Sequence, residues 1–185
     1  MAQAKLLLVA GISCSGKTTL AKQVALELGA HHLSMDDYYR PYDELPIEAR
    51  KQVNFDSPEA IEHELLVGHL ERLIEGQAIQ KPIYDAPSFT RLEYRDHVTS
   101  TEFIVLEGLF CLYWPDLVDL SRHRVFVETD PSLCLARRVD RDTRLYGRSE
   151  EESLRRYRTQ VEPNQNRFVL PTKVNSTLIV SGASG

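Results

Sequence analysis

A glycine-rich segment near the start of the chain has the residue types and spacing that bind phosphate. Residues 11–18 read GISCSGKT and match the P-loop pattern G-x-x-x-x-G-K-[ST]. Gly11 and Gly16 let the backbone curl so that successive N–H groups point at phosphate oxygens. Lys17 is a point charge for the β- and γ-phosphates, and the Thr18 hydroxyl is a ligand for Mg²⁺. The segment predicts a site for ATP, or another nucleoside triphosphate, with Mg²⁺, formed by Gly11, Ser13, Cys14, Ser15, Gly16, Lys17, Thr18 and Thr19.

Three acidic residues follow short apolar runs that are typical of buried strands. Asp36 and Asp37 come after residues 31–35, and Glu107 comes after residues 103–106. Ligands of open parallel sheets bind beyond the carboxyl ends of the strands, and phosphoryl transfer needs a carboxylate to orient the attacking hydroxyl. We therefore take Asp36 as the candidate base, Glu107 as the candidate acid on the metal side, and Asp37 as the weaker of the adjacent pair. An acid at a strand end is otherwise commonly a solvated or capping residue, but the P-loop nearby favours the catalytic interpretation, with Lys17 as Asp36's partner in catalysis.

An arginine-rich segment is the third part of the sequence whose residues could take part in phosphate chemistry. Its five arginines lie within residues 130–148, four of them at i, i+4, i+7 and i+11 along one helical face: Arg137, Arg138, Arg141, Arg144 and Arg148. One interpretation is a solvated face paired to Asp140 and Asp142. The other is a lid, about residues 130–150, that closes over transferring phosphate. The excess of positive charge in this segment favours the lid.

Predicted strands and helices, which could position these residues, alternate along the chain. Apolar runs predict strands at 5–10, 31–35, 103–106, 124–127 and 177–180, and periodicity and caps predict helices at 17–28, 58–75, 131–146 and 150–161. Residues 38–54 read as loop, and residues 82–98 as an excursion that could contain a hairpin. This alternation indicates an α/β fold with a mainly parallel, five-stranded sheet flanked by helices.

Bulk composition narrows the class of protein. A chain of 185 residues suits one domain, here residues 1–185, and its net charge of −5 disfavours a nucleic-acid partner. The three cysteines are widely spaced, which indicates reduced thiols. The longest apolar run near the start is too short for a membrane span or a signal peptide, so we expect a cytoplasmic protein that does not bind membranes. Homo-oligomer formation is left open.

With these pieces in order, the chain resembles the uridine kinase (uridine–cytidine kinase) family. It resembles more loosely the wider group with phosphoribulokinase, pantothenate kinase and nicotinamide riboside kinase. The matching motifs run almost end to end: GISCSGKTT at 11–19, MDDYYR at 35–40, NFDSPEA at 54–60, PIYD at 82–85, LEG at 106–108, the 128–148 segment and LPTK at 170–173. The resemblance implies a P-loop NTPase fold with an Arg-rich lid and a substrate-binding excursion at about 36–98. It implies transfer of phosphate from ATP to the 5′-hydroxyl of a pyrimidine ribonucleoside.

The resemblance also implies a role for individual residues. Asp36 would be the base on the 5′-hydroxyl and lie near Mg²⁺ with Thr18 and Glu107. Asp56 and Arg138 would bind the ribose hydroxyls. Tyr84 would pack on the base, where Arg148 would contact it, and Arg141 would reach the ATP phosphates. Tyr84 alone could equally be a core anchor.

Two positions depart from the family pattern, and both belong to the expected substrate pocket. Phe89 stands where the family usually has a base-reading His, and Arg156 stands before Tyr157 where the family has a substrate-side Gln. Because Phe cannot hydrogen-bond a base edge, we expect weak discrimination between uridine and cytidine, or another nucleoside-like acceptor.

Other classes fit the sequence less well. Nicotinamide riboside is the closest competing acceptor, and pantothenate and a sugar phosphate are further alternatives. A non-enzymatic GTP-binding switch would carry NKxD and DxxG motifs, and neither string occurs in the chain.

Overall fold

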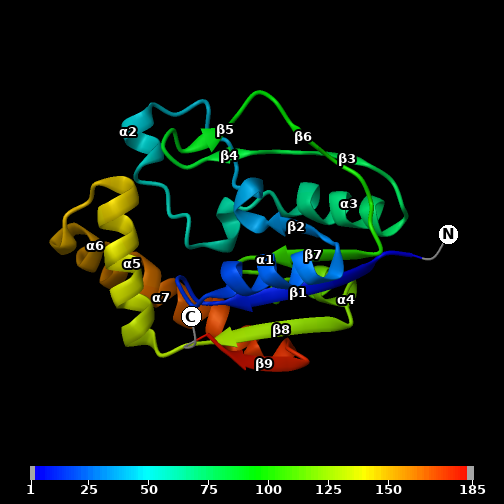
Figure 1. Ribbon diagram of the computed structural model, residues 1–185. Coiled ribbons are helices and arrows are strands. Elements are labelled where there is room, and N and C mark those ends of the chain that lie inside the picture. The colour runs from blue at the N-terminus through cyan, green and yellow to red at the C-terminus, as the bar shows by residue number, and fades with distance from the viewer. Residues whose placement is uncertain (1–2, 183–185) are drawn as a thin grey trace.

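Five parallel strands form the central sheet of the computed structural model, which describes residues 3–182 (Figure 1). Their spatial order is β2 (His31–Ser34), β7 (Phe103–Glu107), β1 (Lys5–Gly11), β8 (His123–Glu128) and β9 (Leu178–Ser181). All four pairings are parallel. The predicted five-stranded α/β fold is therefore confirmed, and each strand lies at or within a residue or two of its predicted position.

The sheet is buried on both faces because its strands are apolar on both sides. In β1, Leu6 and Leu8 belong to the larger core cluster, which contains the apolar face of α3 (His63–Ile74). Val9 points the other way and packs with Ala21 and Ala25 of α1 (Lys17–Leu28). A continuous apolar run is what a strand covered on both faces requires.

The segment between β2 and β7 contains more short helices and turns than the sequence predicted. It contains α2 (Ile47–Arg50) inside the predicted loop, a 3₁₀ turn at Met35–Tyr38 and another at Pro58–Ala60. Two antiparallel pairs, β3 (Ile79–Lys81) with β6 (Asp96–Val98) and β4 (Tyr84–Asp85) with β5 (Thr90–Arg91), confirm a hairpin in the excursion. In Figure 1 these elements lie along the upper side of the molecule, over the level of the sheet.

The single helix predicted at 58–75 is wrong. The backbone at Ile61 is extended and forms a bridge with Tyr39, so that the 3₁₀ turn and α3 are separate. The N–H of Arg40 donates to the carbonyl of Ala60, and that of Glu62 to Tyr38, each at 2.8 Å. These tertiary hydrogen bonds replace those of a continuous helix.

The C-terminal third carries the predicted arginine helix and an irregular helical run. α5 (Pro131–Tyr146) begins after Asp130, whose carboxylate accepts from the N–H of Ser132, and ends at Gly147 in the left-handed region. α6 (Glu150–Arg156) does not stop near residue 161 as expected, but continues through π-helical turns, the short α7 (Glu162–Asn164) and a 3₁₀ turn that ends at Asn175. A further short helix, α4 (Pro115–Asp119), precedes β8. In the described part of the chain no helix is long and apolar enough to cross a membrane.

Candidate active site

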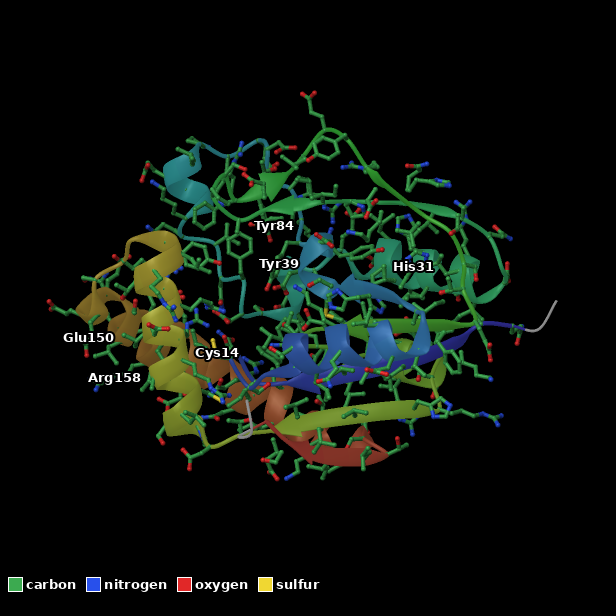
Figure 2. All side chains as sticks on the ribbon, in the orientation of Figure 1. Cys14, His31, Tyr39, Tyr84, Glu150 and Arg158 are labelled. Atoms are coloured by element: carbon green, nitrogen blue, oxygen red, sulfur yellow. The ribbon has the colours of Figure 1, made fainter. Side chains whose placement is uncertain are left out.

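A cavity of about 910 Å³ opens at the carboxyl ends of the strands, between the P-loop, the excursion and α5. It brings together fifteen of the residues that the sequence singled out: Ser13, Cys14, Gly16, Lys17, Thr18, Thr19, Asp36, Asp56, Tyr84, Phe89, Glu107, Arg138, Arg141, Arg148 and Arg156. Figure 2 shows Cys14 beside α5, with Tyr39 and Tyr84 under the β4–β5 pair.

Gly11 and Ser15 are the two predicted residues that do not line the cavity. A Cβ on Gly11 would lie 2.6 Å from Ser15 Oγ and 2.7 Å from the carbonyl of Val127, so glycine is needed there for close packing of the loop on β8. Gly16, with φ of 95°, turns the chain into α1 in a conformation that side-chain-bearing residues rarely adopt. Both glycines thus shape the loop.

The phosphate end of the cavity is formed by the P-loop. Lys17 Nζ donates to the carbonyl of Ile12 at 3.5 Å, which folds the side chain back along the loop. The hydroxyl of Thr18 lies on the first turn of α1, where backbone N–H groups are free of intrahelical partners. This arrangement presents cationic and N–H donors to an anion.

The acid pair Asp36 and Glu107 lies next to the P-loop. Glu107, the last residue of β7, is buried and accepts a hydrogen bond from Ser34 Oγ at 3.2 Å. Asp36 is open to the cavity, but the protein around it removes much of its hydration. This desolvation, and then repulsion from Glu107, raises the pKa of Asp36 from 3.8 to about 6, against the attraction of Lys17.

Asp37 points to a different partner. Its carboxylate forms an ion pair with the buried Lys81 at 2.5 Å and accepts from the N–H of Tyr84 at 3.2 Å. These contacts link the start of the excursion to its later part. Asp37 therefore has a structural role, which Asp36 lacks.

The donor set suits Mg²⁺. Thr18, Asp36 and Glu107 contribute a hydroxyl and two carboxylates to one cavity, and hard oxygen donors are what Mg²⁺ prefers. The described residues contain no cluster of three or more His, Cys, Asp or Glu side chains able to hold a metal. A donor set this small fits an ion that keeps water and shares substrate phosphates.

Aromatic rings form one wall of the cavity. Tyr39, Phe55 and Tyr84 pack with ring centroids 5.1–5.9 Å apart, and Phe89 lies 6.0 Å from Phe55. Phe89 has φ of 54°, in the left-handed region. The hydroxyl of Tyr84 is buried with no hydrogen-bond partner in the described chain. This wall can receive a flat, partly polar group.

Two arginines of α5, and Arg148 just beyond its end, converge on one buried acid. Asp142 is fully buried, and its carboxylate lies 2.9 Å from Arg141, 3.4 Å from Arg148 and 3.6 Å from Arg138. By contrast, the Asp140–Arg144 pair is exposed, as the interpretation of a solvated face predicted. α5 therefore contributes to the cavity lining both an exposed ion pair and arginines that are held by a buried acid.

Arg138 connects the two ends of the cavity. It is buried, donates to Ser13 Oγ at 2.9 Å, and lies 3.8 Å from Asp56. Arg137 donates to the carbonyl of Gly182 at 3.0 Å and to that of Cys14 at 3.5 Å. Through these contacts α5 is docked on the P-loop.

Sequence reasoning missed Tyr39, Phe55 and the organising position of Asp142. Tyr39 Oη donates to the carbonyl of Phe55 at 2.9 Å, which fixes two rings of the wall. The signals were present in MDDYYR and NFDSP, where aromatic residues adjoin the acids, but neither segment has a periodicity that shows which side chain faces inward.

A nucleotide-type P-loop, an acid pair at the strand ends and an arginine helix over the cavity define the class of P-loop kinases. The chain belongs to the phosphoribulokinase / uridine kinase family, whose profile matches residues 6–184. The uridine kinase of Chloroflexus aggregans is 38% identical over 94% of this chain and 85% of its own, and that of Lactobacillus johnsonii is 39% identical over 93% and 83%. The structure of phosphoribulokinase from Rhodobacter spheroides superposes with a TM-score of 0.65 at 14% identity, covering 98% of this chain and 71% of its own.

Proposed function

We propose that the protein transfers the γ-phosphate of ATP, or of another nucleoside triphosphate, to the 5′-hydroxyl of a pyrimidine ribonucleoside such as uridine or cytidine. The observation that carries the proposal is one cavity with a P-loop at one end and an aromatic wall beside Asp56 at the other. Relatives named uridine kinase, 37–39% identical over nearly the whole chain, support the same acceptor.

In this proposal Lys17 and the N-terminus of α1 bind the phosphates of the donor. Asp36 orients the acceptor hydroxyl and takes its proton. A pKa of about 6 leaves the carboxylate ionised at neutral pH yet more basic than an ordinary aspartate. Thr18, Asp36 and Glu107 would hold Mg²⁺, which supplies charge neutralisation for the transferring phosphoryl group.

The acceptor end positions the nucleoside. Asp56 and Arg138 would bind the ribose hydroxyls, since a carboxylate accepts and a guanidinium donates. Tyr84 would pack against the base, and Arg148 would contact its edge. Arg141, held by Asp142, would reach the donor phosphates.

The assignments of the domain, the excursion and the lid belong to the same proposal. Residues 1–185 act as one kinase domain, with the excursion at about 36–98 receiving the acceptor and the lid at about 130–150 covering the phosphates. A salvage enzyme of this kind would act on free nucleosides in the cytoplasm.

A substrate screen tests the proposal. ADP release would be measured with ATP and Mg²⁺ for uridine, cytidine, nicotinamide riboside, pantothenate and ribulose 5-phosphate. We expect turnover with a pyrimidine nucleoside, and none with nicotinamide riboside, because its cationic ring would face the arginines of α5. Turnover with one of the other three acceptors alone would refute the assignment.

Lys17→Ala is the matched test of the donor site. It should abolish turnover and leave the unfolding midpoint nearly unchanged, since Lys17 contacts a single loop carbonyl at the limit of hydrogen-bond distance. Near-normal kinase activity in the variant would contradict the placement of the donor phosphates.

A further inference from the structure

Arg156 is a cation that lines the cavity without a close partner for its guanidinium in the described chain. Its side chain is partly buried and lines the cavity, and its Nε is buried with no hydrogen-bond partner. In the described chain no carboxylate lies within 4.0 Å of its guanidinium nitrogens. An unpaired buried donor of this kind costs free energy unless a ligand supplies an acceptor.

The neighbours of Arg156 make the imbalance larger. Loss of hydration, and then repulsion from Arg148 and Arg138, lowers the pKa of Arg156 from its ordinary value. The acid nearest to those two arginines, Asp142, is already shared among three guanidinium groups. Asp56 lies closest to Arg138. Glu152, one turn earlier in α6, attracts Arg156 but forms no ion pair with it, so Arg156 has no carboxylate in direct contact within the described chain.

Arg156 and Asp36 have different charged neighbours. The charges that act most strongly on Arg156 belong to Arg148, Arg138, Glu152 and Asp56, and those that act on Asp36 belong to Glu107, Lys17, Asp37 and Arg141. In the described chain Arg156 forms no hydrogen bond or ion pair with the P-loop, whereas Arg138 does, through Ser13.

The cavity as a whole also has more cationic than acidic side chains. Seven cationic side chains line it against five acidic ones, in a chain whose net charge is −5. The neighbouring aromatic wall is apolar at Phe55 and Phe89, and its tyrosine hydroxyls carry no negative charge. A neutral nucleoside can offer Arg156 a hydroxyl or carbonyl oxygen, but no negative charge to offset this excess of cations.

We propose that Arg156, with Arg148 beside it, forms a subsite for an anionic group carried by the acceptor, and that the preferred acceptor is a pyrimidine ribonucleoside with a carboxylate on its base. The proposal rests on the proposed function and refines its substrate class. A planar guanidinium matches a carboxylate through two parallel hydrogen bonds. Such a group would satisfy Arg156 and offset its repulsion with Arg148.

The test compares acids with their neutral esters. Uridine carrying a carboxylate at C5 or at C6 and the corresponding methyl esters would be titrated into the protein by calorimetry without ATP, and then assayed for phosphorylation. Acid and ester are similar in shape and differ in charge. We expect at least one acid to bind about 10- to 100-fold more tightly than its ester, as for one charge-assisted pair.

Three variants test whether Arg156 is responsible for the preference for the acid over its ester. Arg156→Gln should remove the preference for the acid, whereas Arg156→Lys should keep part of it because the charge remains. Arg158→Gln is the control, since Arg158 is exposed at the outer edge of the α6 region (Figure 2) and outside the cavity lining. Because Arg156 stands among like charges, Arg156→Gln should unfold at the same temperature as the wild type or at a higher one.

The outcomes separate the two proposals. If no acid binds more tightly than its ester, or the preference survives in Arg156→Gln, the anionic subsite is refuted even when uridine is a substrate. If an acid binds through Arg156 but no pyrimidine nucleoside is phosphorylated, the subsite stands and the proposed function fails.

Discussion

Replacing Asp142 by Asn should destabilise the protein far more than the same change at Asp140, two positions earlier in α5. Asp142 is fully buried among three guanidinium groups, and Asp140 is exposed with a single partner. Asparagine keeps the shape of aspartate but removes its charge. The two variants therefore compare a buried cluster with a surface pair in one helix.

The expected magnitudes follow from burial. Removing one partner of a buried ion pair costs about 3–5 kcal/mol, because the remaining charges lose their compensation. We place Asp142→Asn near 3 kcal/mol, since the amide oxygen still accepts a hydrogen bond. The exposed pair of Asp140 is worth about 0.2–1 kcal/mol. For a chain of this size, a loss of 3 kcal/mol lowers the Tm by about 6–12 °C.

Urea unfolding followed by circular dichroism measures both variants, with the free energy taken by linear extrapolation. ATP should stabilise Asp142→Asn more than the wild type, because its phosphates replace part of the missing negative charge. A free energy of unfolding for Asp142→Asn within 1 kcal/mol of Asp140→Asn would refute the claim that Asp142 holds the arginine cluster.

The remaining predictions concern the acid pair and the aromatic wall. Asp36→Asn should lower kcat by about 10²-fold or more, and Asp37→Asn much less, because Asp37 is paired with Lys81; steady-state kinetics that rank Asp37 first would contradict the base assignment. Asp36→Asn should also raise the Tm at pH 7, measured in EDTA. The pKa of Asp36 in the folded state, about 6, lies above the ordinary 3.8, so the ionised carboxylate destabilises the fold above pH 6. The gain in Tm of Asp36→Asn should therefore vanish as the pH falls towards 4. Phe89→His should raise kcat/KM for uridine or cytidine by about 5- to 30-fold, the equivalent of one restored hydrogen bond; a loss on both would place Phe89 outside the base pocket.

The sheet and the phosphate end could be predicted because their signals are local. A buried parallel strand is a short apolar run, and a P-loop is a fixed pattern, so neither depends on distant residues. The face formed by Arg137, Arg141 and Arg144 follows from helical spacing alone. Arg148 lines the cavity with them, but it lies beyond the end of α5 at Gly147, so helical spacing does not account for its position.

Features that depend on tertiary contacts could not be predicted. Residues 58–75 have helical composition throughout, and only the bridge from Ile61 to Tyr39 divides them. Asp142 looks like any acid in a charged helix, and its burial depends on the arginines around it and on α6, which packs against α5. Phe55 and Tyr84 are about thirty residues apart in the sequence, with α3 and β3 between them, and neither lies in a segment whose periodicity marks an inward face.

The position of Arg138 between Ser13 and Asp56 has a consequence for how acceptor specificity can diverge. Under the proposed function, a mutation at Arg138 or Asp56 would alter the acceptor end of the cavity and disturb the P-loop at once, because Arg138 contacts both. Phe89 and Arg156 line the same cavity without contacting a P-loop side chain through any ion pair or hydrogen bond within residues 3–182. Under the proposed function, these two positions can vary without altering the donor end of the cavity.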